Sequence, residues 1–307
     1  MSDYINPYNY KKIKWQPATS EKIKHFYEND FLRLTENNPS YLHPRNISEF
    51  GISLVNPVIT THGPREFIRR KNIDIDSYEK LQKVCLDLMQ NDPQKRILED
   101  SYPKGIYFGL NDIQKYGWLL AFDIDAKNIA KKGLCSLHNG QTNGKLTSEQ
   151  TEIVKSLPPE DYLYCFNCLY LSIQYAYQVR TILKEWGFEE KNIRIYYSGQ
   201  GTHIHVDSPS SWAYGTTTRE YIQKMLIEKY GIPLDPTVTC DTSRVLRYPG
   251  SLNAQVNRFV AEIGTDNTIN TFEKVIGNVQ HRTSSTINSL QLQPIRYDAA
   301  FSCNETP

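Results

Sequence analysis

Two aspartates at the end of an apolar run constrain this 307-residue chain more than any other feature. The run reads WLLAFDID over residues 118–125. Because side chains alternate between the faces of a strand, Phe122 and Ile124 should enter a core while Asp123 and Asp125 project together from the other face. Two carboxylates this close repel unless a cation neutralises them. The pair predicts a divalent-metal site, although DxD taken alone is more often a solvated strand edge.

The composition predicts a globular protein without a global basic field. Hydrophobic residues make up 39% of the chain, and its formal net charge is +1. A nucleic-acid site would therefore have to be a local basic patch. We find no signal segment and no apolar run long enough to cross a bilayer. We therefore expect no membrane partner and an intracellular location, cytoplasmic (nucleoid) in a prokaryote or nuclear in a eukaryote.

Hydrophobic periodicity predicts an α+β protein with helices and strands in mixed order. The expected helices cover 20–34, a stretch after Ser77, 169–186, and 217–230, the last opened by a capping box of Thr217 and Glu220. The expected strands are a hairpin of 105–110 and 117–125, followed by 192–197, 202–206 and 255–263. Between the first two helices we expect a polar, basic region containing Arg45, Arg65, Arg69 and Arg70.

A glycine-bearing turn follows one of these strands and reads SGQGTHIHV over residues 198–206. Such a turn lets the backbone approach a phosphate closely. His203 directly follows the turn and is placed to donate a hydrogen bond to a triphosphate oxygen. A plain hairpin carrying two surface histidines, His203 and His205, is the alternative for an isolated turn of this kind.

The segment 234–253 holds two aspartates and two arginines around a short apolar core. Arg247 can neutralise phosphate, and Asp235 or Asp241 can complete a metal cage. The same residues could instead form Asp–Arg ion pairs that organise a loop.

A cysteine and histidine cluster lies between these motifs. Cys135-x-x-His138 is followed, after 26 residues, by Cys165-x-x-Cys168. Zinc takes Cys and His ligands in tetrahedral sites built from such short-spaced pairs. The spacing favours a closed, structural zinc site over a redox CxxC motif.

The order of these motifs resembles the archaeo-eukaryotic primase superfamily, and within it the small, catalytic subunit of DNA primase. The resemblance is carried by LLAFDID, the cysteine–histidine cluster, the helix ending in EWGF, YYSGQGTHIHV and LDPTVTCDTSRVLRYPGSLN, and is strong over residues 100–260. It implies a primase-type catalytic core, a mixed β-sheet flanked by helices, over residues 1–275. A zinc knuckle would be inserted at about 128–170, and residues 276–307 remain unassigned.

The resemblance also implies roles for individual residues. Asp123, Asp125 and Asp235 match the catalytic aspartates that bind Mg²⁺ or Mn²⁺, with Asp241 as a second candidate. The residues that match nucleotide contacts are Ser198, Gly199, His203, Arg247 and Asn253, and the structural zinc ligands are Cys135, His138, Cys165 and Cys168. Gln200 stands where the family commonly has arginine, and Asn253 where it often has histidine.

The resemblance implies a nucleotidyltransferase that synthesises short primers from nucleoside triphosphates on single-stranded DNA by two-metal chemistry. A large primase subunit is the expected partner, and Arg69 and Arg70 are candidates for template binding. Three alternatives stay open: a self-standing primase-polymerase, an end-joining or translesion polymerase of the same superfamily, and a zinc-stabilised nucleic-acid-binding module without chemistry.

The cysteine spacing generates a first prediction. Purified native protein should contain about one zinc per chain, because four Cys and His ligands form a closed tetrahedral site. Elemental analysis measures the metal directly. Protein that is folded but free of zinc would contradict the assignment.

Overall fold

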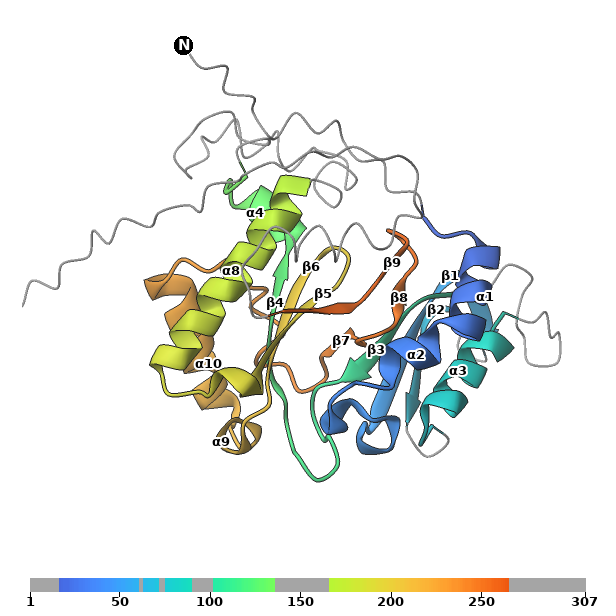
Figure 1. Cartoon of the computed structure of the whole chain (residues 1–307), viewed down its shortest axis with the longest axis horizontal. Coiled ribbons are helices and arrows are strands. Elements are labelled where there is room, and N and C mark those ends of the chain that lie inside the picture. Colours follow the sequence, from blue (N-terminus) through green and yellow to red (C-terminus); the bar gives the residue numbers. More distant parts are fainter. Residues whose placement is uncertain (1–16, 61–62, 72–74, 90–101, 136–165, 265–307) are drawn as a thin grey trace, which may run out of the picture.

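The architecture is α+β, as the sequence predicts, and is seen in a computed structural model (Figure 1). The structure describes residues 17–60, 63–71, 75–89, 102–135 and 166–264. Two four-stranded sheets stand side by side, and each carries helices on its outer side. All strand pairs in the described residues are antiparallel. The predicted zinc ligands His138 and Cys165 and the unassigned segment 276–307 lie outside the described residues.

The sheet that carries the two aspartates has the strand order β10-β5-β6-β4. Its strands are β10 (Ala261–Ile263), β5 (Ile193–Tyr197), β6 (Gly201–Val206) and β4 (Leu120–Asp125). Phe122 and Ile124 of β4 are fully buried and pack with the apolar residues of the helix α8 (Phe166–Glu185). Asp123 and Asp125 project from the opposite face, so the alternation predicted from the sequence is confirmed.

The second sheet has the order β2-β1-β3-β7. Its strands are β2 (Gly63–Lys71), β1 (Glu49–Thr60), β3 (Pro103–Gly109) and β7 (Val245–Arg247). One face is apolar, with Phe50, Ile52, Ile106 and Phe108 all fully buried in the cluster that includes the first helices. The other face bears Arg69, Tyr107 and Arg247, which line the cavity described below.

Helices cover the outer faces of both sheets (Figure 1). Those beside the second sheet are α1 (Ser20–Asn29), α2 (Phe31–Thr35) and α3 (Tyr78–Asp87). Those beside the aspartate-bearing sheet are α4 (Ala126–Lys131), α8, α9 (Pro209–Trp212) and α10 (Thr216–Lys224), which continues as a π-helical turn, Met225–Lys229. The remaining elements are three 3₁₀ turns, Ser40–Leu42, Pro44–Asn46 and Glu190–Asn192, and the hairpin of β8 (Leu252–Asn253) and β9 (Arg258–Phe259).

The predicted hairpin of 105–110 and 117–125 is wrong. The first of these strands, β3, pairs with β1 and β7, whereas β4 pairs with β6 in the other sheet. The connection turns through Asp112 and Lys115, both at positive φ, and carries the chain from one sheet to the other. Each strand therefore takes its partners from distant parts of the sequence, which short-range spacing does not reveal.

The region described from the sequence as polar and basic contains the two strands β1 and β2. Phe50, Ile52 and Leu54 alternate with smaller residues along β1, and this period-two pattern was the available signal. The first predicted helix is also divided, because α1 ends at Asn29 and α2 begins at Phe31.

Helix α10 begins at Thr216, and its N-terminal cap differs from the predicted one. Its N-cap is Gly215, and no side chain caps it, so the capping box of Thr217 and Glu220 is wrong. The predicted helix over 169–186 is confirmed as α8. Gly187 follows it at φ +93°, in the left-handed conformation expected of a C-terminal cap.

Arg219 of α10 fixes the entry to β4. Its side chain is fully buried, and its guanidinium donates hydrogen bonds to the carbonyl oxygens of Trp118, Leu119 (3.0 Å), Ser211 (3.4 Å) and Tyr214 (2.9 Å). The group also lies 3.9 Å above the centre of the Trp118 ring. Burial lowers the pKa of Arg219 to about 10, so the side chain stays charged at neutral pH.

We predict that Arg219→Met destabilises the fold by roughly 3 kcal/mol or more, because buried carbonyl groups lose their donors. Urea unfolding measures the loss. Arg33→Met is the control, since Arg33 lies at the surface and its ion pair with Asp30 should contribute about 1 kcal/mol at most. Equal losses in the two variants would contradict the role of Arg219.

Candidate metal and phosphate site

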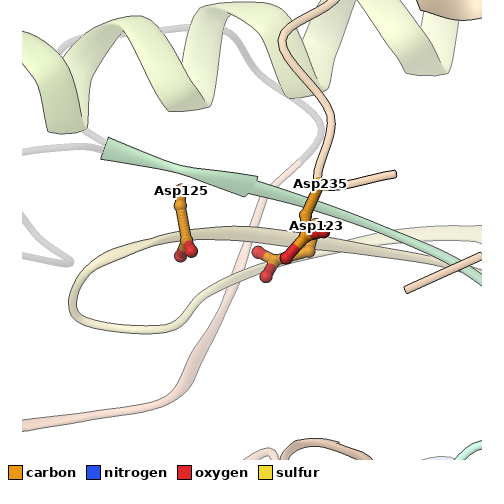
Figure 2. A group of neighbouring side chains, drawn as sticks. All are labelled: Asp123, Asp125 and Asp235. Atoms are coloured by element: carbon orange, nitrogen blue, oxygen red, sulfur yellow. The ribbon is translucent and has the colours of Figure 1, made fainter. Parts of the chain in front are cut away.

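Three carboxylates from two distant segments meet at one place. Asp123 and Asp125 project from β4, and Asp235 lies on the loop that follows the π-helical turn (Figure 2). One oxygen from each carboxylate lies within 4.8 Å of the other two. The backbone amide of Asp235 donates to the carbonyl oxygen of Asp123 at 2.8 Å, which anchors the loop to the strand. Divalent cations prefer such an all-oxygen donor set.

Asp123 is the most strongly perturbed member of this triad. Its residue is 8% exposed, and Oδ1 is buried without a hydrogen-bond partner in the described residues. Burial, together with the charges of Asp125 and Asp235, raises the pKa of Asp123 well above its usual value. An unpaired carboxylate oxygen facing two further carboxylates fits a cation, which would supply the missing partner and remove the repulsion.

The two outer carboxylates have cationic partners. Lys127 Nζ lies 2.7 Å from Asp125 Oδ2, and Arg244 Nη2 lies 3.3 Å from Asp235 Oδ2. Burial opposes the charge on Lys127, but the charge and hydrogen bond of Asp125, together with the charges of Asp123 and Asp235, outweigh it and raise the lysine pKa. Burial likewise opposes ionisation of Asp235, yet two hydrogen bonds from Thr237 and the charge of Arg244 lower its pKa. Asp235 is thus held ionised and Asp125 is paired with Lys127, whereas Asp123 has no cationic partner within hydrogen-bonding distance in the described residues.

The glycine-bearing turn lies directly beside the triad. Gly201 pairs with Asp125 between β6 and β4, and a Cβ on Gly201 would lie 2.3 Å from the carbonyl oxygen of Ile124. Only glycine permits this approach. Asn253 supports the turn from behind, because its Nδ2 donates to the Ser198 carbonyl oxygen at 3.0 Å.

His203 faces Asp123 across the β4–β6 pair. Its Nε2 lies 3.8 Å from Asp123 Oδ1, which is too long for a hydrogen bond. Burial, assisted by the charge of Arg247, lowers the pKa of His203 to about 3, so the ring is neutral at pH 7 and forms no ion pair there. Its Nδ1 is also buried and unpaired within the described residues. His203 is therefore a neutral polar group with unused hydrogen-bonding capacity.

Arg247 lies at the end of β7, on the opposite sheet. Its guanidinium stacks 4.7 Å from the centre of the Tyr107 ring and passes over Gly105, where a Cβ would lie 2.1 Å from Nη1. In the described part of the chain Arg247 forms no salt bridge with a carboxylate. A buried arginine oriented by stacking, with no carboxylate partner there, is suited to bind an anion.

A cavity of about 310 Å³ joins these groups. Its walls come from both sheets, and its residues include Asp123, Asp125, Lys127, Ser198, Gln200, His203, Asp235, Asp241, Arg244, Arg247, Arg69 and Tyr107. The structure thus brings together the predicted residues Asp123, Asp125, Asp235, Ser198, His203 and Arg247. Gly199 and Asn253 lie behind this wall rather than in it, with Gly199 packed against the Asn253 side chain.

The predicted alternative of surface histidines is wrong, because His203 and His205 are both buried. Asp241 lines the cavity but accepts hydrogen bonds from Ser243 rather than joining the triad. Two residues of the predicted zinc set, Cys135 and Cys168, are buried in the same hydrophobic cluster. The other two ligands are outside the described residues, so the zinc site stays a prediction.

Sequence reasoning missed Lys127 and Tyr107 and gave Arg244 no role beyond an Asp–Arg ion pair, which it forms with Asp235. Lys127 and Arg244 are single charged residues in charged segments, and no spacing distinguishes them. Tyr107 lies on a strand that was predicted, but only its pairing with Arg247 on β7 places it at the site.

The fold and site define an α+β protein with an acidic triad that could hold a metal ion, facing a cationic wall. Two curated relatives are the DNA primase small subunit PriS of Sulfolobus acidocaldarius, 26% identical over 183 residues, and that of Sulfurisphaera tokodaii, 28% identical over 189 residues. These matches cover 50% of this chain and 54% and 55% of the two relatives. The chain therefore spans about half the length of the relatives it matches.

No family model matches the chain. The similarity to PriS, at this identity and coverage, gives limited support to a primase-related family. The antiparallel α+β architecture is compatible with a primase catalytic core. In the described part of the chain, no helix combines the length and apolar character required of a membrane span.

The electrostatics of the triad generate a prediction about stability. A carboxyl group with a raised folded-state pKa binds its proton more tightly when folded, so its charge costs stability as pH rises above the unfolded pKa. Asp123→Asn should therefore be more stable than the wild-type chain at pH 7 without metal. It should also lose most of the stabilisation by Mn²⁺, which we expect to raise the wild-type melting temperature by about 3 °C or more.

Differential scanning fluorimetry with EDTA or Mn²⁺ measures both effects. Asp241→Asn is the matched control, because hydrogen bonds from Ser243 lower the pKa of Asp241 and the residue is outside the triad. This control should keep the Mn²⁺ shift and gain no stability. A lost shift in Asp241→Asn, or a full shift in Asp123→Asn, would place the cation elsewhere.

Proposed function

We propose that this chain is the catalytic subunit of a DNA primase, which synthesises short primers on single-stranded DNA by metal-dependent nucleotidyl transfer. The single observation that supports this most is the meeting of Asp123, Asp125 and Asp235 within 4.8 Å beside a cavity with a cationic wall. The similarity to PriS proteins independently supports the same conclusion.

The residues of the triad would hold Mg²⁺ or Mn²⁺. In nucleotidyl transfer such ions activate a hydroxyl nucleophile and stabilise the charge on the phosphates. Asp123 fits this task because its unpaired oxygen and raised pKa leave it in need of a counter-charge. Asp125 and Asp235 would contribute carboxylates whose positions are already fixed by Lys127 and by Thr237.

Groups from both walls of the cavity would bind the triphosphate. Arg247 is buried and oriented over Tyr107, and neutral His203 can donate one N–H to a phosphate oxygen. Ser198 lines the same cavity from the glycine-bearing turn. Catalysis would then depend on positioning and on charge stabilisation, since the protein itself forms no covalent bond to the substrate.

Further components of the proposal follow from the sequence motifs. A structural zinc ion would be held by Cys135, His138, Cys165 and Cys168. A large primase subunit would be the partner, and the protein would act in the cytoplasm of a prokaryote or in the nucleus of a eukaryote.

Asp123→Ala and Asp125→Ala should each reduce primer synthesis by about 10³-fold or more, because each removes a ligand of the catalytic cation. The assay follows labelled nucleotide incorporation on unprimed single-stranded DNA with Mn²⁺ or Mg²⁺. Asp241→Ala is the matched control and should retain most of the activity.

The same assay separates the alternatives. Incorporation only from an annealed primer would favour an end-joining or translesion polymerase. Efficient unprimed synthesis without any partner would favour a self-standing primase-polymerase. DNA binding with no incorporation under any of these conditions would identify a non-catalytic module, and substantial synthesis by Asp123→Ala would refute the assigned mechanism.

A further inference from the structure

The face of the second sheet that bears Tyr107 and Arg247 continues beyond the cavity as an aromatic surface. Strand register sets its composition: Gly51 of β1 pairs with Arg69 on one side and with Tyr107 on the other, and Tyr107 pairs with Arg247. The adjacent row is Phe67, Ser53 and Gly105. These side chains share one face because they are opposite or two residues apart along antiparallel strands.

The far end of the Phe67 ring lies over Gly51 on this face. A Cβ on Gly51 would lie 2.3 Å from Cζ of Phe67, so the ring covers the glycine backbone. The Phe67 and Tyr107 ring centres are 5.4 Å apart, with their planes at 61°. Glycine at position 51 therefore provides the space that allows the aromatic ring to lie against the strand.

Phe67 is also exposed. It retains 36% of its surface. In the described part of the chain, Tyr221 is the other large hydrophobic residue that is exposed. A ligand that covers the exposed part of this ring would gain hydrophobic free energy. Tyr221 lies on α10, which covers the outer side of the other sheet, and so offers a comparison away from the cleft.

The position of Phe67 relative to the cavity decides which ligand fits. Arg247 and Tyr107 line the cavity beside the triad, whereas Phe67 contacts Tyr107 but is not part of the cavity wall. Moving outward from the carboxylates, a ligand would therefore meet Arg247, then Tyr107, then Phe67. Arg69 borders the same path, with its guanidinium fixed by Glu49 at 3.1 Å and by the Ser243 carbonyl oxygen at 2.8 Å.

We propose that Phe67 is a stacking platform for a nucleobase of single-stranded DNA that enters the cleft across β2. An exposed aromatic ring on an antiparallel sheet, flanked by arginines that complement phosphates, binds single strands with little sequence preference. This inference rests on the proposed function, because it names the surface that receives the template. It differs from the nucleotide site in that it needs neither the triad nor a metal ion.

The test measures binding of a dye-labelled thymidine oligomer of about 12 nucleotides by fluorescence anisotropy, in EDTA and without nucleotide. Phe67→Ala should weaken binding about fivefold or more, the loss expected for one stacked base. Phe67→Trp should keep wild-type affinity within about twofold, because indole stacks at least as well. Tyr221→Ala, the matched exposed aromatic, should bind as the wild-type chain does.

A second oligomer identifies stacking as the cause. With abasic sites in place of its bases, wild-type and Phe67→Ala chains should bind with equal affinity, since no base is present to stack. Equal binding of the thymidine oligomer by wild-type and Phe67→Ala would overturn the platform. It would also be overturned by an equal loss in Tyr221→Ala, by an equal loss on the abasic oligomer, or by a wild-type chain that binds no single-stranded DNA.

Failure of this inference is distinguishable from failure of the proposed function. Asp123→Ala should bind the thymidine oligomer normally in EDTA while losing synthesis. If Phe67→Ala weakens binding in a chain that incorporates no nucleotide, the result supports the stacking platform and contradicts the primase proposal. If synthesis depends on Asp123 but Phe67→Ala binds DNA normally, the result supports the primase proposal and contradicts the stacking platform.

Discussion

Repulsion between three carboxylates is the constraint on which the site depends. Their oxygens lie within 4.8 Å of one another, and Asp123 is buried with one oxygen unpaired in the described residues. The fold holds this arrangement through the β4–β6 ladder and the hydrogen bond from the Asp235 amide to the Asp123 carbonyl oxygen. Lys127 and Arg244 neutralise the outer two carboxylates but leave Asp123 without a counter-charge. The chain thus keeps an unfavourable charge at the point where a cation would convert the repulsion into coordination.

The two sheets make different contributions to the cleft. The aspartate-bearing sheet supplies the negative groups and the neutral imidazole of His203, whose pKa is lowered by burial. The second sheet supplies Arg247, Arg69 and the aromatic rings that orient or border them. A polyanion that carries metal ions would fit between the two walls. Its cations would face the carboxylates of one wall, and its phosphate oxygens would face the arginines of the other.

The sequence was informative where a pattern had a local cause. Alternation over 118–125 predicted which side chains of β4 enter the core, and the turn at 198–201 was recognised from its glycines. Prediction from the sequence failed where strand partners are far apart in the chain. The sequence predicted a hairpin of β3 and β4, yet each of them pairs with strands from distant segments. Lys127, Arg244 and Phe67 carry no pattern of their own, because their significance arises only when strands and loops from separate segments assemble.

A buried aromatic and histidine seam fixes the relation between the two walls. His205 of β6 packs edge-to-face against Phe108 of β3, with ring centres 5.7 Å apart, and at a tilt against Tyr196, at 4.7 Å. Its Nδ1 lies 3.0 Å from the Tyr41 hydroxyl, and burial lowers the pKa of His205 so that the ring stays neutral. Close packing of this kind resists relative movement of the packed elements. The separation between Arg247 on one sheet and Asp123 on the other is therefore set beneath the cavity, by residues that touch neither a metal ion nor a phosphate.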